Sequence, residues 1–133
     1  MRANTIKGLL DQIVPHLEDR KQKMLDRLRQ NFEEHSNKTT VDENRFEQEL
    51  IYYLEKMDIT EEQVRLTQHC KYFLEVLNNK KRVKGRKLNF ISQEMGREIN
   101  TIGSKANHSQ IQHIVVQMKD ELEKIKEQLA NTL

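Results

Sequence analysis

The sequence has few of the residues that interrupt helices or build disulfide frameworks. Its 133 residues include one proline, four glycines and one cysteine. Because helix breakers are scarce, and because Glu, Lys, Gln, Leu and Arg dominate the composition, we expect an all-α chain. The single thiol, Cys70, cannot form an internal disulfide and is predicted to be a packing residue. A lone cysteine favours a reducing, cytoplasmic setting.

Targeting segments and common catalytic motifs are also missing. No apolar stretch approaches the roughly 20 residues that a helix needs to cross a bilayer, and the N-terminus does not resemble a signal peptide. The sequence contains no P-loop, dinucleotide fingerprint, zinc cluster or nucleophile motif. Since the net charge is only +2, affinity for nucleic acid would have to come from local patches.

What the sequence does contain is helical periodicity. Between Asn4 and His35, apolar residues recur at intervals of three, four or seven, which predicts one long amphipathic helix. This stripe consists of Ile6, Leu10, Ile13, Leu17, Met24, Leu28 and Phe32. Pro15 lies inside it, and its missing backbone donor predicts a kink or a new helix starting nearby. The segment from Ser36 to Asn44 breaks the pattern and predicts a loop.

Two shorter helices follow. Thr40 with Glu43, or alternatively Asp42, predicts the N-cap of the first, which should end near Met57. Thr60, followed by two acids and a glutamine, predicts the capped start of the second. The apolar residues that mark the first of these helices are Phe46, Leu50, Leu54 and Met57. The residues predicted to line the buried side of the second are Val64, Cys70, Phe73, Leu74 and Leu77.

The segment from Lys80 to Lys87 is a basic linker with six positive residues among eight. It can dock a phosphate backbone, or it can be a solvated loop, and it has no aromatic residue to stack on bases. The residues after it, Leu88 to Ile102, predict a fourth helix that Gly103 and Ser104 end or bend.

The last helix, predicted from about Ser109, carries a seven-residue apolar repeat typical of a coiled coil. The repeat consists of Ile111, Val115, Met118, Leu122, Ile125 and Leu129. Such a seam needs a partner helix, and both the Leu88 to Ile102 stripe and the first helix are compatible. We therefore expect an elongated helical bundle or hairpin of about five helices.

Two polar clusters could carry chemistry. Glu94 and Glu98 are four residues apart and share a helix face, with Arg97 beside them. Two carboxylates at this spacing can ligate a hard divalent cation, and a guanidinium can hold a phosphate. The alternative is an ordinary solvated face with a Glu–Arg ion pair.

The second cluster places Glu62, Arg65 and His69 on one face of the third helix. His69 could act as a general base or a metal ligand, because its unperturbed pKa lies nearest neutrality. Alternatively, it packs against the bundle and bonds Arg65 or Glu62. The other histidines, which have no second ligand at a convincing spacing, are predicted to lie at the surface. They are His16, His35, His108 and His113.

Several runs of residues resemble the YicC/YloC family in order and spacing. These runs are Arg45–Leu50, Asp58–Glu62, Arg65–Leu66, His69, Gly85–Phe90, Gln93–Met95, Arg97–Glu98, Asn100–Lys105 and Glu123–Asn131. The resemblance implies a metal-dependent endoribonuclease that uses manganese, or alternatively magnesium, binds RNA and assembles as a homo-oligomer, a hexamer in that family. It also implies that residues 1–133 form a single helical domain similar to the family's C-terminal domain, without its N-terminal α/β domain.

The resemblance implies three sets of site residues whose individual roles stay open. The catalytic set is Glu94, Glu98, His69 and Arg97; the metal set is Glu94, Glu98, Glu62 and Asp58; the RNA-binding set is Arg45, Arg65, Arg86, Lys87, Lys105 and Asn100. The alternative function is a non-catalytic oligomerisation and RNA-binding module. An adaptor coiled coil would fit the seven-residue repeat but leaves the segment from Gly85 to Lys105 without a role.

Overall fold

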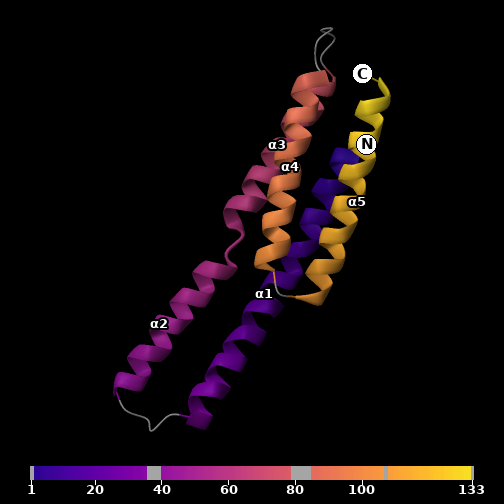
Figure 1. The fold of residues 1–133 in the computed structure, drawn as a ribbon. Coiled ribbons are helices and arrows are strands. Elements are labelled where there is room, and N and C mark those ends of the chain that lie inside the picture. Colours follow the sequence, from indigo (N-terminus) through magenta and orange to yellow (C-terminus); the bar gives the residue numbers. More distant parts are fainter. Residues whose placement is uncertain (1, 36–39, 79–84, 107, 133) are drawn as a thin grey trace.

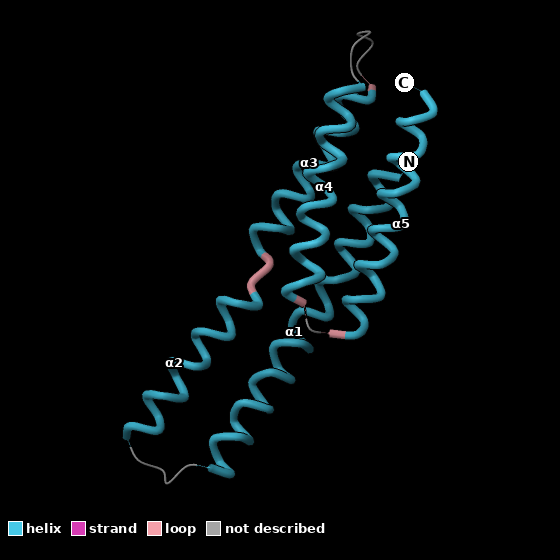
Figure 2. Tube along the Cα trace, in the orientation of Figure 1, coloured by secondary structure: helices cyan, strands magenta, loops and turns pink. Residues whose placement is uncertain are grey.

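The computed structural model describes residues 2–35, 40–78, 85–106 and 108–132, and within these ranges it contains five α-helices and no strand. The helices are α1 (Arg2–His35), α2 (Thr40–Met57), α3 (Thr60–Leu77), α4 (Gly85–Lys105) and α5 (Ser109–Thr132). They account for nearly the whole trace (Figure 2). The predicted all-α class is confirmed. None of the helices in the described ranges is long and apolar enough to span a membrane.

The helices form an elongated bundle with a projecting arm. The first half of α1 runs beside α5, while α3 packs on α4 and α4 on α5 (Figure 1). The second half of α1 leaves this bundle and pairs with α2 alone to form what we call the α1–α2 arm (Figure 1). The predicted elongated architecture is therefore confirmed.

The seven-residue repeat of α5 lies at the centre of the core. All six of its apolar residues are at most 8% exposed, and Ile111 and Met118 are fully buried. Because α5 packs against both α1 and α4, two helices of the same chain supply the partner that the repeat requires. Burying each such side chain stabilises the fold by about 1.5–3 kcal/mol. The predicted stripe of α4, from Leu88 to Ile102, is buried as well.

Glycines allow α4 to approach α5 closely. A Cβ added at Gly96 would lie 3.1 Å from Leu122 Cδ2, and one added at Gly103 would lie 3.1 Å from Val115 Cγ1. The predicted end or bend of the helix at Gly103 and Ser104 lies next to the observed end, since α4 finishes at Lys105. Gly103 itself lies inside the helix, where it serves packing against α5.

Other expected helix boundaries need correction. α1 runs unbroken through Pro15, so no new helix starts there. Pro15 and Asp11 are both at the surface, where water can bond the carbonyl that Pro15 leaves without a donor. α2 already begins at Thr40, which makes residues 40–44 of the predicted loop helical. In the basic linker, residues 85–87 belong to α4, and residues 80–84 lie outside the described ranges.

The buried face of α3 is displaced from the predicted one. Val64 is 51% exposed, so its predicted burial is wrong, whereas Leu66 is fully buried. The buried positions recur at intervals of three or four from Ile59 through Glu62, Leu66 and Cys70. A carboxylate occupies one position of this stripe, and periodicity of apolar residues alone could not place it there.

Candidate functional site: the α3–α4 cluster

Charged side chains from α3 and α4 converge on a single guanidinium. We call Glu61, Glu62, Arg65, Glu98 and Lys105 the α3–α4 cluster. Arg65 Nε donates to Glu98 Oε1 at 3.0 Å, and Arg65 Nη1 donates to Glu61 Oε2 at 3.2 Å. Arg65 Nη2 lies 3.6 Å from Glu62 Oε1. The hydrogen bond with Glu98 is the main cause that raises the pKa of Arg65, so this residue stays charged.

Two carboxylates of the α3–α4 cluster are buried. Glu62 is 3% exposed and Glu98 is 6% exposed, while the Arg65 side chain is 46% exposed. Lys105 Nζ lies 3.0 Å from Glu62 Oε1 and donates to the Asp58 carbonyl at 3.1 Å. Glu62 Oε2 has no hydrogen-bond partner among the described residues. Buried carboxylates with incomplete pairing cost stability, and sequences commonly retain such costs at functional sites.

The predicted pair on α4 is divided between two environments. Glu98 points to Arg65 of α3, whereas Glu94 Oε1 lies 3.9 Å from Arg97 Nη2 on its own helix. The Arg97 side chain is 75% exposed, and that of Glu94 is 25% exposed. The two carboxylates therefore do not share a common partner in this structure.

His69 and Asp58 lie at the margins of the cluster. His69 is half-buried, one turn beyond Arg65, and has no hydrogen bond to Arg65 or Glu62 in the described part of the chain. Asp58 Oδ1 accepts the Thr60 backbone N–H at 3.0 Å and the Thr60 hydroxyl at 2.5 Å. The hydroxyl hydrogen bond is the main cause that lowers the pKa of Asp58. The Asp58 carboxylate therefore shapes the turn before α3.

The fit of these residues to a divalent cation can be tested on their contacts. Within residues 2–35, 40–78, 85–106 and 108–132, no group of three or more His, Cys, Asp or Glu side chains could hold a metal ion. Glu62 and Glu98 face Arg65, Glu94 faces Arg97, and the Asp58 carboxylate bonds Thr60. In this arrangement the expected metal set does not fit a manganese or magnesium ion.

The expected RNA-binding residues are spread over the molecule. Arg65 and Lys105 belong to the cluster, but Arg45 lies near the start of α2, in the α1–α2 arm (Figure 1). Arg86 and Lys87 are exposed at the other end of α4, about 27 Å from Lys105 by helical rise. Asn100, also on α4, is exposed as well. The structure brings together two of the six.

Sequence reasoning missed Arg20 and His108. Arg20 is only 7% exposed, and its Nη2 donates to the Met57 carbonyl at 2.7 Å. The available signal was the seven-residue gap in the stripe between Leu17 and Met24, because Arg20 occupies the missing position. His108 is 8% exposed, so its predicted surface position is wrong.

His108 is buried because both ring nitrogens have structural partners. Its Nδ1 accepts the Ile111 backbone N–H at 3.3 Å, which caps the start of α5. Its Nε2 donates to Asp19 Oδ2 at 2.8 Å. This hydrogen bond is the main cause that lowers the pKa of Asp19. The pair ties α5 to α1 where the arm leaves the bundle.

The fold and the cluster together define a class of protein: an all-α helical module with a half-exposed guanidinium held by buried carboxylates. A family model described as "Endoribonuclease YicC-like, C-terminal" matches residues 13–132. The chain belongs to this YicC-like family.

Two curated relatives are similar to the chain. "Probable endoribonuclease YicC" of Clostridioides difficile (strain 630) is 38% identical over 135 residues, which cover 98% of this chain and 45% of that protein. A protein of the same name from Haemophilus influenzae (strain ATCC 51907 / DSM 11121 / KW20 / Rd) is 38% identical over 106 residues, 80% of this chain and 36% of that protein. The chain thus spans less than half the length of these relatives.

Proposed function

We propose that this chain is the helical domain of an endoribonuclease that acts on RNA, and that the α3–α4 cluster is part of its active site. The proposal is supported by the names of the two relatives and by the family match. The observation that carries it is the convergence of buried Glu62 and Glu98 on half-exposed Arg65. An ordinary exposed helix face would not bury two carboxylates.

Arg65 is the residue that would meet the RNA backbone. Glu98 fixes Nε from the buried side, and the outer edge of the guanidinium bonds Glu61, whose side chain is 80% exposed. An arriving phosphodiester can displace this exposed ion pair and accept two parallel hydrogen bonds from the guanidinium. When a phosphodiester is cleaved, such a preorganised donor stabilises the negative charge that develops on the phosphate oxygens.

His69 is our candidate for proton transfer. It follows Arg65 by one helical turn, is half-buried, and has no hydrogen bond that fixes its ring among the described residues. Neutral imidazole can remove a proton from the attacking hydroxyl, and imidazolium can donate one to the departing oxygen. Arg97 and Glu94, about two and three turns along α4 from Lys105, would line the approach to this site.

Three further properties remain proposals. They are dependence on manganese, assembly into a homo-oligomer and a cytoplasmic location. Because the described side chains do not fit a divalent cation as arranged, the metal is the property most in need of a direct test. Cleavage of RNA in excess chelator, compared with cleavage in manganese or magnesium, provides it.

Cleavage of end-labelled RNA by purified variants tests the proposed active site. Arg65→Gln and Glu98→Gln should each lower the cleavage rate by about 100-fold, as expected for loss of a preorganised donor or of the group that positions it. Arg29→Gln, an exposed position on α1, is the matched control and should cleave normally. Wild-type rates in both cluster variants, with helical content intact by circular dichroism, would refute the assignment.

The alternative proposal is a non-catalytic oligomerisation and RNA-binding module. It is favoured by the exposed apolar residues of α2, where Ile51 is 57% and Tyr52 58% exposed. Such side chains could meet another copy of the chain. A chain that binds RNA tightly and forms oligomers in solution, yet leaves RNA intact with manganese present, would favour this function over the first.

A further inference from the structure

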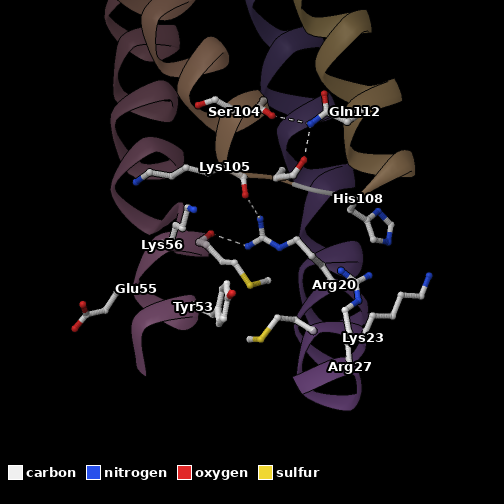
Figure 3. Close-up of a pocket in the computed structure, with 14 residues that line it drawn as sticks. Arg20, Lys23, Arg27, Tyr53, Glu55, Lys56, Ser104, Lys105, His108 and Gln112 are labelled. Atoms are coloured by element: carbon white, nitrogen blue, oxygen red, sulfur yellow. Dashed lines mark hydrogen bonds between the residues drawn. The ribbon is translucent and has the colours of Figure 1, made fainter. Parts of the chain in front are cut away.

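A pocket of about 780 Å³ lies where the α1–α2 arm meets the bundle (Figure 3). Side chains from α1, α2 and the junction of α4 with α5 line it. Five of its lining residues are cations, namely Arg20, Lys23, Arg27, Lys56 and Lys105. Glu55, the one acidic residue that lines the pocket, points away from the other labelled side chains (Figure 3). The lining is therefore positive on balance, although Lys105 bonds Glu62 and Lys23 pairs with Asp19.

Arg20 forms the back of the pocket. Its Nη2 and Nη1 donate to the carbonyls of Met57 and Lys105 at 2.7 and 3.4 Å (Figure 3). Within the described residues it forms no ion pair with a carboxylate, and its Nε has no hydrogen-bond partner. Burial accordingly lowers the pKa of Arg20. The attraction of Asp58 offsets this effect only in part. A buried charge without a direct ion pair is costly, and an anion in the pocket would offset that cost.

Lys23 and Arg27, on the next two turns of α1 after Arg20, also line the pocket. Arg27 is exposed and has no ion pair in the part of the chain that the structure describes. Lys23 shares its charge with Asp19 Oδ2 at 3.2 Å, a pair exposed enough for solvent to weaken it. Both side chains are thus available to an incoming phosphate.

Tyr53 adds an aromatic surface to the same pocket. It is 39% exposed, and its ring packs edge-on against Tyr52 with the centroids 5.4 Å apart. Aromatic faces beside a positive groove are the arrangement by which proteins bind single-stranded nucleic acid, because any base can stack on them.

We propose that this pocket binds one nucleotide of single-stranded RNA, with its phosphate at Lys23 and Arg27 and its base on Tyr53. Arg20 supplies a fixed positive charge behind the phosphate. The proposal rests on the proposed function for the identity of the ligand. The pocket adjoins the α3–α4 cluster through Lys105, which lines the pocket and bonds Glu62. A nucleotide held here would lead the strand toward Arg65.

The test compares two double variants of the 133-residue chain on the same helix. Lys23→Ala with Arg27→Ala removes two pocket cations, and Lys21→Ala with Arg29→Ala removes two exposed cations outside it. Binding of a short fluorescent single-stranded RNA is measured by anisotropy across a salt series. The pocket variant should bind about tenfold more weakly. The slope of its log K against log salt concentration should be less steep by about 1.4, or about 0.7 for each lost phosphate contact. The control variant should match the wild type.

A second pair of variants tests the aromatic surface. Tyr53→Leu should weaken RNA binding at least about fivefold, whereas Tyr72→Leu should not, since Tyr72 is similarly exposed on α3 but lies outside the pocket. Inorganic phosphate and adenosine monophosphate are the competitors that distinguish a strand from a free ligand. If phosphate or adenosine monophosphate displaced the labelled RNA at concentrations as low as those of unlabelled RNA, the ligand would be a free phosphate or nucleotide and not an RNA strand.

The outcomes separate this proposal from the proposed function. Equal weakening by both double variants would overturn the pocket, because it would show attraction by the surface charge as a whole. If the pocket variant alone loses binding and no preparation cleaves RNA, the pocket is supported and the endoribonuclease proposal fails. If the wild type cleaves RNA and the pocket variant binds and cleaves equally well, the pocket fails and the endoribonuclease proposal is unaffected.

Discussion

Arg65 Nε and Glu98 Oε1 lie 3.0 Å apart and join α3 to α4 across 33 positions of sequence. The two ends of this ion pair differ in their surroundings, since the Glu98 side chain is 8% exposed and that of Arg65 is 46% exposed. The carboxylate therefore depends on the guanidinium for neutralisation more than the guanidinium depends on it. A binding partner can reach Arg65 without breaking into the core.

The ion pair predicts that the destabilising effects of mutations at Arg65 and Glu98 are not additive. Arg65→Ala should lower the free energy of unfolding, because it leaves Glu98 and Glu62 buried with fewer cations. Arg65→Ala combined with Glu98→Gln should cost less than the sum of the two single changes, since the buried charge of Glu98 is then gone. Urea denaturation of the four proteins measures both effects. Strictly additive losses would show that the pair contributes nothing.

Acid should weaken the turn before α3. The native pKa of Asp58 is lowered below its ordinary 3.8, chiefly by the Thr60 hydroxyl, so the ionised carboxylate stabilises the folded state. That stabilisation is complete above the unfolded-state pKa and is lost as the pH falls through the native value, below about pH 4. Asp58→Ala should cost about 0.5–1 kcal/mol at neutral pH and less in acid.

Thermal unfolding of wild type and Asp58→Ala over an acidic pH series measures this difference. Asp120→Ala, an exposed position on α5, is a suitable control. A gap between wild type and Asp58→Ala that stays constant from neutral pH to well below pH 4 would contradict the role assigned to the carboxylate.

The parts of the fold that follow from apolar periodicity could be predicted from sequence. The seam of α5 has an apolar residue at every expected position, so its burial and its need for partners were evident. Glu62 and Glu98 could not be placed in the same way, because each is a charged residue in a buried stripe, and the only signal for Arg20 was a gap in the stripe of α1. Their partners come from other helices, such as Lys105 for Glu62, 43 positions away. A sequence pattern within one helix does not show which residue of another helix will be the partner.

The expected site was therefore recovered only in part. The resemblance to the family selected Glu62, Arg65, Glu98 and Lys105, which the structure brings together. Pairing of Glu94 with Glu98 was expected from their spacing, but spacing cannot tell that one of them turns toward α3. The pocket around Arg20 depends on where the arm leaves the bundle, and no local pattern specifies that.

Cys70 should be unreactive in the folded protein. It is fully buried, and burial raises the pKa of its thiol to about 12. Because the thiolate is the reactive form, thiol reagents at neutral pH should modify the chain only as fast as it unfolds. The modification rate, followed spectrophotometrically with a chromogenic disulfide, should rise steeply with denaturant. Rapid and complete modification in native buffer would contradict this prediction.

Three helical glycines should respond differently to alanine. A Cβ at Gly8 would meet nothing within 4 Å, so Gly8→Ala should stabilise the chain by about 0.4–1 kcal/mol through the reduced entropy of the unfolded state. At Gly96 the nearest atom is Cδ2 at the end of the flexible Leu122 side chain, 3.1 Å away, so a small shift of that side chain should offset the gain and leave Gly96→Ala near neutral. Chemical denaturation of the three variants in one buffer gives the comparison.

Gly103→Ala should be the one of the three that destabilises the chain. Its Cβ would lie 3.1 Å from Val115 Cγ1, and Val115 is 1% exposed at the centre of the α4–α5 contact. A β-branched valine has one strongly preferred rotamer in a helix, so it cannot turn away, and the two helices must separate instead. Overpacking of this kind typically costs about 1–3 kcal/mol. Restoring the space with Val115→Ala in the Gly103→Ala background should recover part of the loss, whereas a gain in stability from Gly103→Ala alone would show that the α4–α5 contact is not close-packed at this point.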